Sequence, residues 1–175
     1  VMGVIETLQL PKDRVAMITP CYSLPLSSVS NGLLHEEGCI NVALCGLATI
    51  KAFSIVNTCH GDIKPGNMML TNRDNLVVMI DFGSAVEYGK SISATTPGFP
   101  LDKPADGSLS FDLTCLSSSI FVLATGKRLP PTARELTEML NLELQVAVRA
   151  SIQIAVACLG DASIDELWIQ AQQYV

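Results

Sequence analysis

Charged and aromatic residues are scarce in this sequence of 175 residues: they make up 16% and 5% of it, whereas hydrophobic residues make up 49%. Basic residues are the scarcer charged kind, 11 against 17 acidic ones, which gives a formal net charge of −6. Such a chain lacks the broad positive field that sequence-independent nucleic-acid binding needs, so we expect no nucleic-acid partner. The hydrophobic content excludes intrinsic disorder as the main state and indicates one domain, or the larger part of a bigger one.

The sequence also lacks the spacings that mark zinc sites, disulfide frameworks and membrane spans. None of the six cysteines forms a C-x-x-C pair, and most have apolar neighbours, which favours buried, reduced thiols. No apolar run is long enough to span a membrane, because residues 113–125 are too few and Lys51 interrupts residues 41–59. The first ten residues contain Glu6 and no basic residue, unlike a signal peptide. We therefore expect an intracellular protein without a membrane segment.

Hydrophobic periodicity predicts two strands at the start of the chain and mostly helices after them. The two strands fall within residues 1–10 and 15–19, a long and mostly buried helix within residues 36–56, and a strand–turn–strand unit within residues 68–80. Residues 81–107 form a long loop in this interpretation. Four further helices are predicted over residues 113–125, 132–142, 143–159 and 163–174. This order of elements is typical of an α+β protein.

Polar residues with a clear chemical pattern lie on both sides of the predicted strand–turn–strand unit. Asp62 and Asn67 precede it and Asp81 follows it. Because a hairpin brings its two ends together, Asn67 and Asp81 are expected to face one another. Carboxylate and amide oxygens at that separation suit Mg²⁺, which binds one or two protein carboxylates together with substrate phosphates. Asp62 is then a second carboxylate that can accept a proton, and Lys64 is a point charge suited to phosphate.

The order of these residues resembles that of the protein kinase family. The family's catalytic loop reads H-R-D-x-x-x-x-N and its metal loop D-F-G; this sequence has H-G-D-I-K-P-G-N at residues 60–67 and D-F-G at residues 81–83. The lysine two residues after the aspartate is similar to the serine/threonine type. T-P-G-F at residues 96–99 resembles the segment before the family's A-P-E motif, and residues 112–130 resemble the central helix of the large lobe.

The resemblance implies a kinase-like α+β fold. Residues 1–22 correspond to a two-strand remnant of the N-terminal lobe with the hinge, and residues 23–175 to a mainly helical C-terminal lobe. The implied function is phosphoryl transfer from ATP, with Mg²⁺, to serine or threonine hydroxyls of a protein substrate. The implied site residues are Asp62 and Lys64 for catalysis, Asn67 and Asp81 for the metal, Thr19, Cys21, Tyr22 and Met69 for ATP, and His60, Phe82, Gly83 and Asp112 for support of the site.

Departures from the family's pattern leave an alternative open. Gly61 replaces the arginine that reads a phosphate on the activation loop. The A-P-E glutamate and its arginine partner are missing, and the 175 residues contain neither a G-x-G-x-x-G loop nor a V-A-I-K lysine. The alternative is a catalytically weak kinase-like module (a pseudokinase) that binds or regulates. A small-molecule phosphotransferase is a weaker idea that T-P-G-F disfavours. A partner chain or second copy is expected to cover the strand edges of Val1–Thr19.

Overall fold

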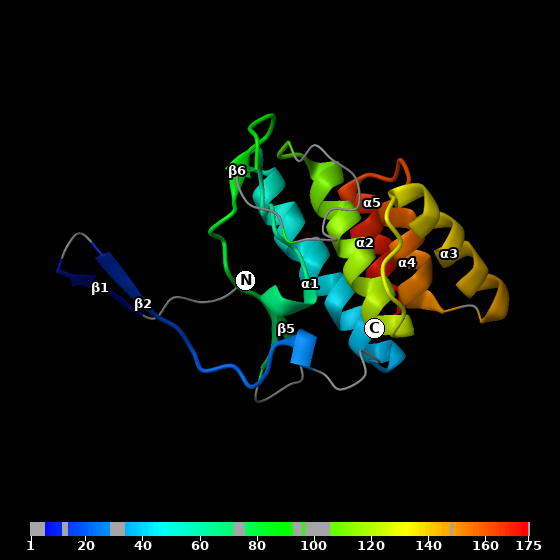
Figure 1. Cartoon of the computed structure of the whole chain (residues 1–175), viewed down its shortest axis with the longest axis horizontal. Helices are drawn as coiled ribbons and strands as arrows, with labels where there is room; N and C mark the ends of the chain where they lie inside the picture. Colours follow the sequence, from blue (N-terminus) through cyan, green and yellow to red (C-terminus); the bar gives the residue numbers. More distant parts are fainter. Residues whose placement is uncertain are drawn as a thin grey trace.

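The structure is a computed structural model that describes residues 6–11, 14–28, 34–71, 76–92, 96, 106–147 and 149–174. These residues form five α-helices and three small two-stranded sheets (Figure 1). The predicted α+β class is confirmed, and the arrangement is compatible with part of a kinase-like fold. Among the described residues, no helix has both the length and the apolar character that a membrane span requires.

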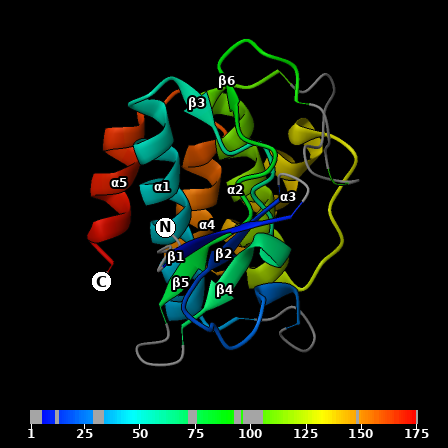
Figure 2. The ribbon, with the colours of Figure 1, turned by 90° about the vertical axis from the view of Figure 1, so that its left-hand side faces the viewer.

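Two long helices, α1 (Glu36–Ser54) and α2 (Leu109–Thr125), form the centre of the molecule. They approach closely because Gly46 on α1 has no side chain: a Cβ there would lie 2.3 Å from Leu116 Cδ1 on α2. Of the remaining helices, one packs against both members of this pair and the other two pack on it from either side, so that the helices lie side by side (Figure 2). These remaining helices are α3 (Ala133–Val146), α4 (Ala150–Cys158) and α5 (Ile164–Gln172). The buried hydrophobic core fills the space between the helices.

Capping residues set several helix ends. Ser108 accepts a hydrogen bond from the third backbone N–H of α2, Thr132 does the same for α3, and Ser163 forms a capping box with Glu166 on α5. Gly126 ends α2 in the left-handed conformation, with a φ of 67°. These local signals are readable in the sequence and place the helices that hold the site.

Two predicted helix boundaries were wrong. The buried helix begins at residue 109 rather than 113, since Ser108 is its cap. The predicted break between residues 142 and 143 does not exist, because α3 continues to Val146. No glycine or proline interrupts the chain there, and Leu142 is exposed on a continuous helix. α4 then begins at Ala150.

A polar cluster joins three helices at one end of the bundle. The carboxylate of Glu36, in the first turn of α1, accepts from Arg149 Nε at 2.8 Å, from Ser151 N at 2.7 Å and from Ser151 Oγ at 2.9 Å. Arg149 also donates to the Ala124 carbonyl near the end of α2 at 2.7 Å. Burial opposes ionisation of Glu36, but the hydrogen bonds from Ser151 and Arg149 hold its pKa below the ordinary value.

The three sheets are short antiparallel pairs. β1 (Glu6–Leu10) and β2 (Arg14–Ile18) form a hairpin that stands away from the helical body (Figure 1). The predicted strand–turn–strand unit is confirmed as β4 (Met68–Leu70) and β5 (Val77–Met79). β3 (Thr58–Cys59) pairs with β6 (Val86–Glu87). The expectation that residues 81–107 form only a loop was wrong, because β6 is too short to show a period in the sequence.

The segment after the first hairpin joins the body at β4. Ser23 N donates to Leu70 O at 3.0 Å, and Leu70 N donates to Leu24 O at 3.1 Å. Pro25 forms a bridge with Met69, and the short 3₁₀ helix η1 (Leu26–Ser28) follows. The domain boundary expected at residues 22 and 23 stays a prediction.

Candidate active site

The loop that precedes β4 is held in place from α2. Asp112, in the first turn of α2, accepts from His60 N at 2.7 Å through Oδ2 and from Gly61 N at 3.0 Å through Oδ1. This carboxylate is 1% exposed, and burial raises its pKa to about 6, against the effect of the two hydrogen bonds. The capped start of α2 therefore fixes the backbone of the loop that carries the other polar residues.

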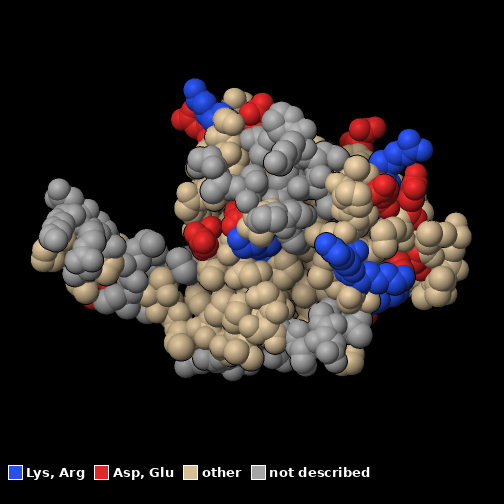
Figure 3. Space-filling model, viewed as in Figure 1, with Lys and Arg blue, Asp and Glu red and all other residues tan. Residues whose placement is uncertain are grey.

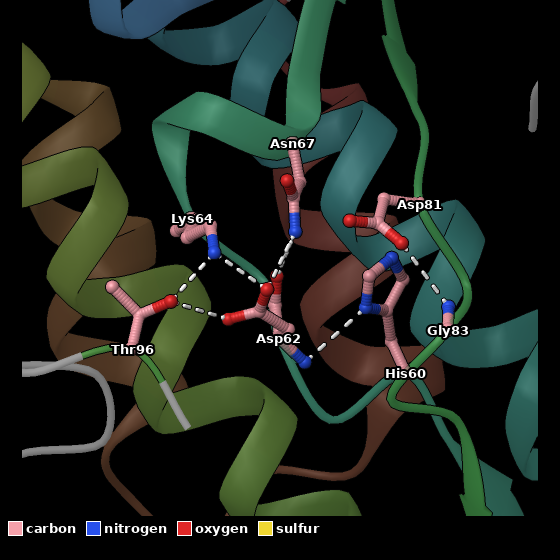
Figure 4. Close-up of polar contacts among 7 residues, drawn as sticks. All are labelled: His60, Asp62, Lys64, Asn67, Asp81, Gly83 and Thr96. Carbon is pink, nitrogen blue, oxygen red and sulfur yellow. Dashed lines mark hydrogen bonds and ion pairs between the residues drawn. The ribbon is translucent and has the colours of Figure 1, made fainter. Parts of the chain in front are cut away.

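The carboxylate of Asp62 is the centre of the site (Figure 4). Its Oδ2 accepts from Lys64 Nζ at 2.6 Å and from Asn67 Nδ2 at 2.8 Å, and its Oδ1 accepts from Thr96 Oγ1 at 2.9 Å. Asn67 Nδ2 also donates to the Asp62 carbonyl at 2.9 Å. Three donors on a largely buried carboxylate fix its orientation.

Thr96 belongs to this cluster, a contact that its place in the T-P-G-F segment did not predict. Lys64 Nζ donates to Thr96 Oγ1 at 2.5 Å, so Asp62, Lys64 and Thr96 form a closed triangle. Thr96 and Asp62 are 34 positions apart. No local pattern gives such a contact, which depends on the path of the chain between the two residues.

Asn67 and Asp81 lie at the two ends of the β4–β5 hairpin, as the hairpin geometry requires. Asn67 ends the short 3₁₀ helix η3 (Pro65–Asn67), and its carbonyl accepts from Ile80 N at 2.9 Å. Figure 4 shows the Asp81 carboxylate directed toward the side on which Asn67 and Asp62 lie. The structure therefore brings Asp62, Asn67 and Asp81 together.

The backbone at Asp81 is strained. Its φ of 59° lies in the left-handed region, which a residue with a side chain seldom adopts. Asp81 Oδ1 accepts from Gly83 N at 3.2 Å, and this hydrogen bond supports the conformation. The carboxylate is consequently aimed by the turn itself rather than by packing, since Asp81 is exposed.

The donor set of the site fits a magnesium ion. Asn67 Nδ2 points to Asp62, which leaves Asn67 Oδ1 as the atom that can bind a cation, and Asp81 adds carboxylate oxygens. Oxygen donors of this kind suit Mg²⁺, which is bound by few protein groups together with phosphates and water. In the part of the chain that the structure describes, no group of three or more His, Cys, Asp or Glu side chains could hold a metal.

Three rings lie beneath the loops. His60 and Phe82 have ring centroids 5.2 Å apart, and Phe53 of α1 lies 6.0 Å from His60 and 5.6 Å from Phe82. Burial lowers the pKa of His60, and its Nδ1 accepts from Asp62 N at 3.3 Å, so the neutral ring carries its proton on Nε2. His60 is therefore a support of the Asp62 backbone. The sequence showed Phe53 only as one apolar position of a helix.

Gly61 is required by the path of the backbone. Its φ is +79°, and a Cβ at this position would lie 2.4 Å from the backbone oxygen of Ser84, just after the D-F-G segment. An arginine does not fit here without displacement of Ser84. The close approach of the loop at Ser84 to the loop at Gly61 thus explains why this chain has glycine where the kinase pattern has arginine.

The residues expected to contact ATP are less closely grouped than those around Asp62. Met69 lies on β4, half-buried, and pairs with Pro25. Cys21 is exposed, and Thr19 and Tyr22 are half-buried on the segment that connects β2 to η1. The structure joins the end of this segment to β4, next to Met69. The ATP-binding roles of these four residues stay predictions.

Charged side chains of both signs are scattered over the face shown in Figure 3. The described residues of that face form no broad positive area of the kind that nucleic-acid binding uses. The expectation of no nucleic-acid partner stays a prediction.

Comparison with known proteins gives one informative similarity. No protein-family model matches the chain. Over 110 residues, the chain is 31% identical to the serine/threonine-protein kinase PknA of Nostoc sp. (strain PCC 7120). The relationship is kinase-like. The match covers 55% of this chain and 20% of PknA, so the kinase-like chain corresponds to about a fifth of that protein's length.

Proposed function

We propose that this kinase-like chain transfers a phosphoryl group from ATP, with Mg²⁺, to serine or threonine hydroxyls of a protein. The observation that carries the proposal is the convergence of Asp62, Asn67 and Asp81 at the ends of one hairpin, with Lys64 bound to Asp62. The similarity to PknA, a serine/threonine-protein kinase, supports the same class of reaction.

Each residue has a defined task in this reaction. Phosphoryl transfer depends on positioning and on charge stabilisation more than on covalent chemistry. Asn67 Oδ1 and the Asp81 carboxylate hold Mg²⁺, which supplies positive charge against the phosphates. Asp62 orients the substrate hydroxyl and accepts its proton. Lys64 neutralises charge on the transferred γ-phosphoryl group from its position beside Asp62.

The segment before η1 binds the adenine end of ATP in this proposal. Met69 forms the floor, backbone groups near Cys21 and Tyr22 contact the adenine edge, and Thr19 stands at the back. The β1–β2 hairpin stands away from the helical body, and within the described parts of the chain no third strand pairs with it (Figure 1). A partner chain or a second copy covers its strand edges, because uncovered edges pair readily with other strands.

Nucleotide binding is tested by thermal unfolding of the wild type, Asp81→Ala and the control Asp161→Ala. Asp161 is an exposed carboxylate in the turn between α4 and α5. ATP with Mg²⁺ is expected to raise the Tm of the wild type and the control, and to leave that of Asp81→Ala unchanged. At about 100 times Kd, the stabilisation is about 2.7 kcal/mol.

A parallel assay of phosphate transfer separates the enzyme from a binding module. Transfer to a protein that is lost in Asp81→Ala supports the enzyme. A thermal shift without any transfer supports the pseudokinase alternative. Absence of a shift, with equal transfer by the wild type and Asp81→Ala, rejects the proposed function.

A further inference from the structure

We propose that Thr96 is a self-phosphorylation site: its hydroxyl accepts the γ-phosphoryl group of ATP bound to the same chain, and the product then limits further transfer. The inference rests on the proposed function, because it uses the same carboxylate. It adds an acceptor residue and a form of regulation to it.

The geometry at Thr96 is that of an acceptor hydroxyl. A general base must lie within about 2.6–3.2 Å of the oxygen whose proton it takes. Thr96 Oγ1 donates to Asp62 Oδ1 at 2.9 Å, inside this range (Figure 4). Other threonine hydroxyls of the described chain are bound differently: those of Thr49 and Thr137 donate to backbone carbonyls of their own helices.

The charge around Thr96 also suits phosphoryl transfer. Lys64 Nζ lies 2.5 Å from Thr96 Oγ1 and 2.6 Å from Asp62 Oδ2, so one cation contacts both the acceptor and the base. An ammonium group at this position stabilises negative charge on an incoming phosphoryl group. The hydroxyl, the base and the cation are therefore in contact before any protein substrate binds.

The step is a direct substitution at phosphorus. A bond forms between Thr96 Oγ1 and the γ-phosphorus while the bond from that phosphorus to the bridging oxygen breaks. The bridging oxygen keeps the electron pair, and ADP leaves. The hydroxyl proton passes to Asp62 and from there to solvent, so no further reactant is needed.

The product changes the contacts of the base. A phosphothreonine carries a charge of about −1.5 to −2 at neutral pH, here beside the Asp62 carboxylate. Asp62 Oδ1 loses the hydroxyl donor that it has in the unmodified chain. Lys64, already in contact with position 96, pairs with the phosphate in competition with Asp62. Position 61 is glycine, so the arginine that reads a phosphate in the kinase pattern is not available to pair with this one. Modified chains therefore transfer phosphate to other proteins more slowly.

The test is incubation of the full chain with Mg²⁺ and ATP, followed by phosphopeptide mapping by mass spectrometry. Wild type, Thr96→Ser, Thr96→Val and Asp62→Asn are compared, with Thr137→Val as the matched control. Dephosphorylated casein is included as an external acceptor. Phosphate is expected at position 96 in the wild type, Thr96→Ser and Thr137→Val, and to be absent there in the other two variants.

Rates separate reaction within one chain from reaction between chains. The fraction modified per unit time is expected to be independent of protein concentration, as a reaction within one chain requires. Transfer to casein should fall at least about tenfold as position 96 fills, which corresponds to loss of one charge-assisted contact. Thr96→Ser keeps a hydroxyl at position 96 and should still be modified. The test therefore remains decisive even if Thr96→Val fails to fold.

Three results overturn the inference. Casein phosphorylation without phosphate at position 96 refutes it and leaves the proposed function standing. A modification rate that rises in proportion to protein concentration shows transfer between chains and refutes the mechanism. No transfer to either acceptor refutes the proposed function, and the inference fails with it.

Discussion

Substitution of Asp112 by asparagine tests the side chain that holds the backbone of the loop at His60 and Gly61. The side chain keeps its shape, but the negative charge is lost. The carboxylate accepts from His60 N and Gly61 N through separate oxygens, whereas in an amide one of these oxygens is replaced by an NH₂ group, which cannot accept. The variant therefore changes both the loop contacts and the pH dependence of stability.

The magnitude follows from the pKa of Asp112. Burial raises this pKa from 3.8 to about 6 in the folded protein. The rise corresponds to about 3 kcal/mol in the free energy of unfolding. Because the pKa is higher in the folded state, the contribution of Asp112 to stability is fully present below pH 3.8 and is lost as the pH rises through about 6.

The assay is urea unfolding of the wild type and Asp112→Asn at several pH values. The free energy of unfolding of the wild type minus that of the variant should decrease by up to about 3 kcal/mol between about pH 4 and pH 7. Asp161→Asn, at an exposed position, controls for the loss of one negative charge. A difference that is constant, or that increases with pH, refutes the reasoning. The hydrogen bonds from the two N–H groups would then balance or exceed the effect of burial on the pKa of Asp112.

Two further predictions concern the contacts between elements. Gly61→Ala should destabilise the protein by at least about 1 kcal/mol more than Gly89→Ala, since both have a φ of +79° but only Gly61 has a close neighbour, Ser84 O; equal losses in chemical unfolding would contradict the clash. Glu36→Gln should lower the free energy of unfolding by about 1 kcal/mol at neutral pH and make it depend less on pH in the acid range. The pKa of Glu36 is lowered on folding, so its contribution is present above the ordinary value of 4.5 and lost below it; an unchanged acid transition would count against the Glu36–Ser151 contacts.

Features that depend on local sequence could be predicted. The periodic apolar positions give the long helix α1, and the two apolar runs around a polar turn give the β4–β5 hairpin. The hairpin in turn brings Asn67 next to the residue before Asp81, so a site at its ends follows from chain geometry. The support of this loop by Asp112 came from the resemblance to kinases, not from spacing.

Features that join distant residues could not be predicted. The contact of Thr96 with Asp62 spans 34 positions, and that of Arg149 with Glu36 spans 113. Neither pair shares a periodic pattern, because each depends on how separate helices and loops pack. Gly61 looked like a missing arginine in the sequence, whereas the approach of Ser84 makes a glycine necessary. The need for glycine at position 61 comes from the loop that contains Ser84, so the sequence around position 61 does not show it.

The central claim is that Asp62, Asn67 and Asp81 act on one nucleotide–metal complex. Its most direct test is the rate of γ-phosphoryl transfer from ATP to casein, measured against Mg²⁺ concentration for the wild type, Asn67→Ala and Asp81→Asn. We predict Mg²⁺-dependent transfer by the wild type and a loss of at least about 100-fold in both variants, as expected when electrostatic stabilisation is removed. Transfer by either variant at the wild-type rate and with the same Mg²⁺ dependence would contradict the claim.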